Sequence, residues 1–280
     1  MKAGVLVDHR GLDDSAIKSL ASLSEELGYS CFSLYDKSRI DSEYLDTWTI
    51  LPGVALGTTR IRVTPLVTDN LVRHPGLLAK MAATVDMISH GRLDFGIGAG
   101  LHGVGTLERR QRIKMLEESI QVMMKLWTEA PLSSFKGEYF NLEDAESLPK
   151  PMQKPHPPIL IGGTSDEVLD VVARYADMSN FDLHSASFEE CEAILHRLKE
   201  CCEREKRSYD SIVKTVLGTC VLDGRTSEET GATLGGSQDK IAEQLSKYSK
   251  IGIDRFIVRF PRQTQSEDMR VFAEKVIPLL

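Results

Sequence analysis

The sequence has few cysteines, and their spacing provides no structural staple. The five cysteines are an odd number, and no two of them form a C-x-x-C pair. This pattern excludes a disulfide framework and a cysteine-based metal site. Free thiols are typical of a reducing compartment. We therefore expect a cytoplasmic protein that binds no metal.

Basic charge and long apolar runs are also scarce. The chain has 34 Lys and Arg against 41 Asp and Glu, a formal net charge of -7. The longest basic cluster, residues 109–112, is short and falls in a helical pattern, whereas nucleic-acid surfaces need clustered cations. No apolar run approaches the roughly 18 residues of a membrane span. Residues 1–7 lack the apolar region of a signal peptide and predict a strand. We expect neither nucleic acid nor membrane as a partner.

Short apolar runs that alternate with longer amphipathic segments dominate what is present. Hydrophobic residues make up 41% of the chain and charged residues 27%, which is typical of a globular protein. Most runs are continuous in Val, Ile and Leu, as in strands buried on both faces of a parallel sheet. The predicted strands are residues 3–7, 31–36, 61–68, 93–99, 158–163, 178–182, 213–222 and 255–260.

A predicted helix follows each of these strands. The first opens at the N-cap residues Asp13, Asp14 and Ser15 and closes at Gly28. The others cover residues 46–56, 76–88, 107–127, 166–175, 188–206, 237–251 and 267–277. Strict alternation favours a parallel sheet, and eight units in about 250 residues indicate a (β/α)8 TIM barrel. We predict a single domain over residues 1–280; the alternative is an open doubly wound sheet.

One segment interrupts the alternation. Residues 133–158 contain the run FKGEYF followed by five prolines, and they are too long for a simple connection between a helix and a strand. We predict a short hairpin followed by an extended, proline-rich connection as an insertion before the fifth strand.

The residues that end each strand should form the working site, because TIM barrels carry their chemistry at the carboxyl ends of the strands. Glycines at 98, 100, 162 and 163 would let the backbone approach a bulky or anionic ligand, or would simply make tight turns. Pro65 inside a strand predicts a bulge, since a closed barrel has no edge. His9, His74 and His102 are candidates for proton transfer.

A family resemblance appears in the central block and in shorter matches along most of the chain. The matching residues are TPLVT (64–68), RHPG (73–76), SHGRLDFGIGAG (89–100), LPKP (148–151), PPILIGG (157–163), ARYAD (173–177) and GIDR (252–255). The chain resembles the bacterial luciferase-like family, and more narrowly its branch that depends on the deazaflavin coenzyme F-420. The resemblance implies a cofactor at the strand carboxyl ends, a cis bond at Pro65–Leu66 behind its ring, and dimerisation.

The resemblance also assigns expected roles to particular residues. The expected cofactor-binding residues are Asp36, Lys37, Thr64, Pro65, Leu66, Gly98, Ala99, Gly100, Gly162, Gly163 and Thr164. His9 and His102 are the expected catalytic residues, and Lys37 and Arg73 could meet anionic groups of the cofactor. Relatives commonly have Asp-His where this chain has Asp36 and Lys37. The loop after Gly100 and the segment between Leu222 and Gly235 are shorter than is usual in the family.

These features leave three hypotheses for function. The first is hydride transfer between reduced coenzyme F-420 and a small-molecule substrate. The second is a monooxygenase that uses FMN. The third is a relative that binds cofactor without turnover, because the shortened loop normally covers the cofactor. A homodimer is expected in each case.

Overall fold

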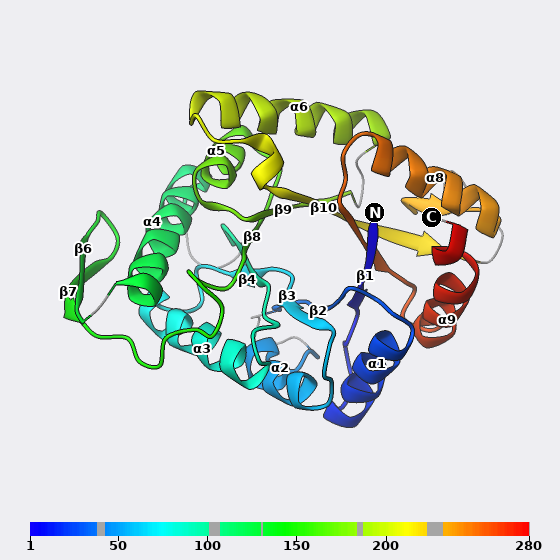
Figure 1. Ribbon diagram of the computed structural model, residues 1–280, viewed down its shortest axis with the longest axis horizontal. Coiled ribbons are helices and arrows are strands. Elements are labelled where there is room, and N and C mark those ends of the chain that lie inside the picture. Colours follow the sequence, from blue (N-terminus) through cyan, green and yellow to red (C-terminus); the bar gives the residue numbers. More distant parts are fainter. Residues whose placement is uncertain (38–42, 101–106, 130, 184–186, 223–231, 280) are drawn as a thin grey trace.

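The computed structural model describes residues 1–37, 43–100, 107–129, 131–183, 187–222 and 232–279, in which a parallel sheet curls into a barrel (Figure 1). The strands of the barrel are β1 (Lys2–Val7), β2 (Cys31–Leu34), β3 (Arg62–Pro65), β4 (Thr68–Asp69), β5 (Phe95–Gly98), β8 (Ile159–Gly162), β9 (Met178–Asp182), β10 (Val213–Val221) and β12 (Arg255–Arg259). Their order is β3-β2-β1-β12-β10-β9-β8-β5-β4. Because β3 and β4 are two parts of the third predicted strand, the two ends of this order meet. The TIM-barrel prediction is confirmed.

Helices surround the barrel, each following its strand (Figure 1). The described helices are α1 (Asp14–Glu26), α2 (Thr47–Leu56), α3 (Pro75–Ile88), α4 (Arg109–Thr128), α5 (Asp166–Tyr175), α6 (Phe188–Arg204), α8 (Gln238–Lys250) and α9 (Gln265–Lys275). The Asp13 side chain accepts a hydrogen bond from the Ala16 N–H, as its predicted role as N-cap requires. A short strand, β11 (Leu234–Gly235), pairs with the end of β10.

The predicted insertion before the fifth barrel strand is a hairpin. Its strands β6 (Ser133–Lys136) and β7 (Asn141–Ala145) pair antiparallel and project beyond α4 (Figure 1). The Glu118 carboxylate on α4 accepts hydrogen bonds from the backbone N–H groups of Glu138, Tyr139 and Phe140 and so anchors the turn. The proline-rich connection then leads to β8.

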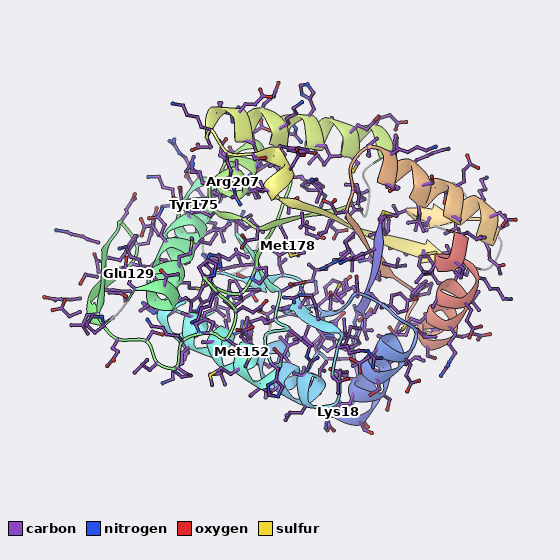
Figure 2. All side chains as sticks on the ribbon, in the orientation of Figure 1. Lys18, Glu129, Met152, Tyr175, Met178 and Arg207 are labelled. Carbon is purple, nitrogen blue, oxygen red and sulfur yellow. The ribbon has the colours of Figure 1, made fainter. Side chains whose placement is uncertain are left out.

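Two apolar layers hold the barrel together. The larger lies between strands and helices; the smaller fills the barrel interior with Leu6, Cys31, Leu66, Leu160, Met178, Leu217 and Ile257. Figure 2 shows Met178 near the centre of the ring of strands and Lys18 on α1, at the edge of the molecule. Burial of this kind stabilises by about 25 cal/mol per Å² of apolar surface. Within the described residues, no helix is long and apolar enough to cross a membrane.

The third predicted strand breaks between β3 and β4, at the position where Pro65 predicted a bulge. Pro65 is still in register with Leu34, and the Leu66 N–H donates to the Leu34 carbonyl at 2.8 Å. The non-proline cis bond is Leu66–Val67, so the expectation of Pro65–Leu66 is wrong by one residue. The ladder to β2 persists through the Leu66 N–H, and the chain therefore leaves it only after that residue.

Candidate functional site

A cleft opens at the carboxyl ends of the strands. Its larger lobe has a volume of about 510 Å³, and an adjoining smaller lobe has about 230 Å³. The larger lobe is lined by Tyr35, Asp36, Lys37, Leu66, Val67, Thr68, Asp69, Gly98, Ala99, Gly100, Arg109, Arg112, Ile113, Gly162, Gly163, Thr164, Ser165, Val168 and Asp182. This is the size of a ligand pocket, at the face where TIM barrels bind their substrates.

The chain break after Pro65 forms part of the cleft wall, and glycines on two neighbouring strands accommodate it. A Cβ atom at Gly98 would lie 2.9 Å from Val67 Cγ2, and one at Gly162 would lie 3.1 Å from Val67 Cγ1. The Val67 side chain therefore packs directly on the backbone of β5 and β8. These glycines shape the wall through close approach, not only through turns.

Two further glycines turn the backbone where their strands end. Gly100 has φ of +85° and Gly163 has φ of +138°, both values that side chains disfavour. A Cβ atom at Gly100 would also lie 2.6 Å from an Asp69 carboxylate oxygen. The two positions follow the ends of the paired strands β5 and β8, and both line the larger lobe. They keep the backbone exposed to whatever occupies the lobe.

Asp36 contributes a buried carboxylate to the cleft wall. Arg73 Nη1 donates to Asp36 Oδ2 at 2.7 Å, and Arg73 Nη2 lies 3.2 Å from Asp36 Oδ1 and 2.6 Å from Asp46 Oδ2. Burial raises the pKa of Asp36 and Arg73 opposes that shift. Arg73 is thus paired with two carboxylates and does not line the cleft. Its expected contact with anionic groups of the cofactor does not fit this geometry.

One end of the larger lobe gathers hydrogen-bond donors. Helix α5 begins there, after Gly163 and Thr164, with Ser165 as its N-cap. Helix N-termini favour anions because their first N–H groups have no partner within the helix. Arg109 and Arg112 of α4 also line this lobe, and Arg112 Nη1 donates to the Gly100 carbonyl at 2.6 Å. Arg112 Nε is buried and has no partner among the described residues.

The opposite side of the cleft carries an aromatic and a cation from the end of β2. Tyr35 lines both lobes. Lys37 lines the larger lobe, and its Nζ lies 4.9 Å from the centre of the Tyr35 ring. An ammonium over an aromatic face is attracted by the ring quadrupole. Lys37 thus has a defined place at the cleft.

The structure brings most of the predicted cofactor-binding residues together. Those that line the larger lobe are Asp36, Lys37, Leu66, Gly98, Ala99, Gly100, Gly162, Gly163 and Thr164. Thr64 and Pro65 are buried behind the wall, and Thr64 Oγ1 has no partner among the described residues. Their predicted contacts with a cofactor stay predictions.

The two histidines predicted to be catalytic are placed differently. His9 is fully buried, with Nε2 at 3.3 Å from the Leu45 carbonyl and its ring edge-on to Tyr44, and it does not line the cleft. Burial lowers the pKa of His9 below its usual value. His102 and most of the shortened loop lie outside the described residues, as do residues 223–231. His74 caps α3 through a hydrogen bond from the Gly76 N–H.

Sequence reasoning missed Arg112 and Tyr35 as residues of the site. Arg109 and Arg112 are three residues apart at the start of α4, which places both side chains on one face of the helix near the barrel mouth. Tyr35 stands directly before Asp36 at a strand end. Both signals were available in the sequence. Among the described residues, no group of three or more His, Cys, Asp or Glu is arranged to hold a metal ion.

The chain matches a protein-family model over most of its length and is similar to two curated proteins over about half of it. A family model described as luciferase-like monooxygenase matches residues 8–246. An uncharacterized protein of Mycobacterium tuberculosis is 36% identical over 153 residues, 51% of this chain and 52% of that protein. Pyrimidine monooxygenase RutA of Acinetobacter baylyi is 32% identical over 150 residues, 50% of this chain and 40% of that protein. The matches thus span about half the length of these curated relatives.

Solved structures share the fold along the whole chain. A coenzyme F-420-dependent secondary alcohol dehydrogenase, in complex with an adduct of that coenzyme and acetone, has a TM-score of 0.87 at 14% identity, covering 100% of this chain and 99% of the other. Monooxygenase RslO1 from Streptomyces bottropensis has a TM-score of 0.83 at 20% identity, covering 99% of each chain. At these identities the likeness concerns the fold.

Proposed function

Because the chain belongs to the luciferase-like monooxygenase family, we propose that it is an oxidoreductase that binds coenzyme F-420 in this cleft and exchanges a hydride with a small-molecule substrate. The observation that carries the proposal is the wall made by Val67 between Gly98 and Gly162. A flat ring needs a wall with little relief, and here the glycines at 98 and 162 let Val67 pack directly on the backbones of β5 and β8. The deazaflavin ring would rest on this wall.

The donors of the cleft fit the rest of such a cofactor. Its phosphate would lie at the start of α5, near Gly163, Thr164 and Ser165, with Arg112 supplying positive charge. The unpartnered Nε of Arg112 and the unpartnered Oγ1 of Thr64 are buried polar atoms that cost free energy while unsatisfied. A ligand with anionic and polar groups would satisfy the first of them.

The protein residues would bind and orient the cofactor, which supplies the hydride chemistry when bound. The Leu66–Val67 segment would support the ring. Asp36, fixed by Arg73, would hold the start of the following chain in place, because the Asp69 N–H lies 3.4 Å from Asp36 Oδ2. The smaller lobe, next to the same wall, would take the substrate. Apolar walls and buried strands would limit access of water to the reacting atoms.

A monooxygenase that uses FMN is the second candidate. Two observations favour it: the matching family model is one of luciferase-like monooxygenases, and the relative from Acinetobacter baylyi is a pyrimidine monooxygenase. The same wall would serve either ring, because FMN and coenzyme F-420 both join a flat tricycle to a phosphate-bearing chain. A relative that binds cofactor without turnover is the third candidate.

Titration of the purified protein with each cofactor distinguishes these candidates. We expect coenzyme F-420 to bind with a micromolar or lower Kd, measured by the change in its absorbance or fluorescence, and FMN to bind more weakly. Preferred binding of FMN, with oxygen consumption in the presence of a reductant, would support the second candidate instead. Binding without hydride exchange to any donor would support the third, and no binding of either cofactor would overturn all three.

We also propose that the protein works in the cytoplasm as a homodimer. All five cysteines are buried and free, as a reducing compartment favours. Exposed apolar side chains on α2 and α3, including Leu56 at 76% and Leu77 at 57% exposure, would be covered by a second copy. Sedimentation velocity at micromolar concentration tests this: a dimer is expected, and a monomer alone would contradict it.

A further inference from the structure

The smaller lobe of the cleft has a phenol in its wall. Its lining residues are Tyr35, Leu66, Val67, Gly162, Gly163, Thr164, Asn180, Asp182 and Leu217. Tyr35 also lines the larger lobe, so it lies between the space for a cofactor and the remaining space of about 230 Å³. This volume is below the range of about 300–1,000 Å³ that is usual for ligand pockets, so it favours a small molecule.

The Tyr35 hydroxyl is held by a cation from β12, which is separated from β2 in the barrel only by β1. Arg259 Nη1, at the end of β12, donates to the Tyr35 hydroxyl at 2.6 Å. The guanidinium is itself oriented by Thr219 of β10, whose Oγ1 accepts from Arg259 Nε at 3.1 Å and from Nη2 at 2.5 Å. Residues from β10 and β12 and the residue after β2 therefore fix one hydroxyl in place.

This arrangement leaves the phenol proton available. A hydroxyl has one proton to donate, and an arginine can only donate, so the Tyr35 oxygen is the acceptor in its bond with Arg259. Burial raises the pKa of Tyr35, although Arg259 lowers it, so the phenol is protonated at neutral pH. The same guanidinium would stabilise the tyrosinate once the proton has left.

We propose that Tyr35 is the proton donor to the carbonyl oxygen of a small aldehyde or ketone bound in the smaller lobe, and that Arg259 is its positioning residue. The proposal rests on the proposed function, which supplies the hydride. As the carbonyl carbon gains the hydride and the C=O double bond becomes single, the carbonyl oxygen takes the Tyr35 proton and the product is an alcohol. Tyr35 then regains a proton from water, and the cofactor is the species oxidised.

Two other polar groups in the smaller lobe, on Thr164 and Asn180, are less suited to this role. Thr164 has a hydroxyl that is far less acidic than a phenol, and the Asn180 Oδ1 accepts a hydrogen bond from Thr215 Oγ1 at 2.8 Å. Of the two histidines predicted to be catalytic, His9 lines neither lobe, and His102 lies outside the described residues. Tyr35 has a phenol proton to donate, lies beside the Arg259 cation that would stabilise its tyrosinate, and lines both lobes.

The first experiment uses no cofactor and measures binding of isobutyramide, an unreactive carbonyl compound, to wild-type protein by ligand-detected NMR. We expect Tyr35→Phe to weaken binding about tenfold, as for the loss of one good hydrogen bond. Tyr44→Phe is the matched control, because the Tyr44 hydroxyl donates to Asp8 at 2.8 Å and does not line either lobe. Absence of binding to wild-type protein, or equal binding to Tyr35→Phe, would overturn the carbonyl site.

A second measurement tests Arg259 without any ligand. The absorbance change of phenol ionisation near 295 nm, taken as wild type minus Tyr35→Phe, reports the pKa of Tyr35. We expect Arg259→Met to raise that pKa further, because a buried tyrosinate loses its cation, and Arg259→Lys to restore part of the effect. The same pKa in wild type and Arg259→Met would show that Arg259 does not act on Tyr35.

The third measurement joins the two proposals and keeps their failures apart. With reduced coenzyme F-420 and butanal or acetone, we expect Tyr35→Phe to bind the cofactor as wild type does but to reduce the carbonyl about 100-fold more slowly. If wild-type protein does not bind the cofactor, the proposed function is overturned. The binding of isobutyramide, measured without cofactor, then still decides whether the carbonyl site exists. If both proteins bind the cofactor and reduce the carbonyl at equal rates, the role of Tyr35 is overturned. The same holds if wild-type protein binds the cofactor but reduces neither butanal nor acetone.

Discussion

The carbonyl oxygen of Pro65 occupies the space where a side chain on Gly96 would begin. A Cβ atom at Gly96 would overlap this oxygen, and the next residues of the same wall, Gly98 and Gly162, are in close approach to Val67. The break between β3 and β4 and the glycines of β5 and β8 are therefore one packing unit. The glycine pattern that resembles the family's is needed for the barrel wall itself, before any ligand binds.

Gly96→Ala should destabilise the protein by about 3 kcal/mol, because the overlap is with backbone, which cannot rotate away. Chemical denaturation followed by circular dichroism measures the effect. Gly57→Ala is the matched control, since a Cβ atom there meets only ordinary contacts at 3.5 Å or more. If Gly96→Ala were as stable as the control, the close approach of Pro65 would be wrong.

Arg73→Met should cost about 3 kcal/mol at neutral pH, because it leaves the buried Asp36 carboxylate without its cation. Burial already raises the pKa of Asp36, and the variant should raise it further. A carboxyl with a raised folded pKa stabilises the fold below its unfolded pKa of about 3.8 and loses that contribution as pH rises. The deficit of the variant should therefore shrink toward acid pH.

Lys114→Gln provides the comparison for this ion pair. Lys114 and Glu138 are 3.0 Å apart, but their side chains are 50% and 58% exposed. Exposed pairs contribute about 0–1 kcal/mol, so this variant should change the free energy of unfolding little at any pH. A deficit of the Arg73 variant no larger than that of Lys114→Gln would contradict the buried pairing with Asp36.

Glu25→Gln should destabilise the protein near neutral pH by roughly 1 kcal/mol. Partial burial would raise the pKa of Glu25, but hydrogen bonds from the backbone N–H groups of Ile61, Arg60 and Thr59 outweigh it and lower the pKa to about 2. A depressed folded pKa stabilises above the unfolded value of 4.5, and this contribution is lost as pH falls toward 2. Thermal unfolding of both proteins should converge at pH 2 and differ at pH 7; a constant difference would contradict this linkage.

Arg112→Met should weaken binding of the phosphate-bearing cofactors about 10-fold to 100-fold, because a charged hydrogen bond to phosphate is lost. It should leave riboflavin and the phosphate-free deazaflavin nearly unaffected. Arg110→Met is the control, since Arg110 is exposed and does not line the cleft. Equal losses for cofactors with and without phosphate would place Arg112 elsewhere than at the phosphate.

His9→Gln should separate the catalytic role predicted from the sequence from a packing role. His9 is buried against Tyr44 away from the cleft, so we expect lower stability, by about 1–2 kcal/mol, and unchanged hydride transfer. Burial lowers the pKa of His9, so wild-type stability should fall as pH drops below 6.5, and the variant should lose this dependence. A rate lowered 100-fold in a stable variant would support catalysis by His9.

The barrel, the insertion and the family all follow from patterns in the amino-acid sequence. Continuous apolar runs alternating with amphipathic segments leave few other ways to bury both faces of a sheet, and caps such as Asp13 and Ser165 mark the helix starts locally. The family resemblance likewise rested on contiguous motifs, and it is confirmed. Strand ends rich in glycine predicted most of the cleft, because carboxyl ends of parallel strands meet at one face.

The identity of the side chains that meet at that face, by contrast, is visible only in the three-dimensional fold. The break in the third strand falls after Leu66, not before it, because the hydrogen bond to Leu34 persists. Arg112 reaches the Gly100 carbonyl, and Tyr35 meets Arg259 although 224 positions separate them in the chain. Such pairings depend on barrel closure and on the rotamers that packing allows, neither of which leaves a local signal in the sequence.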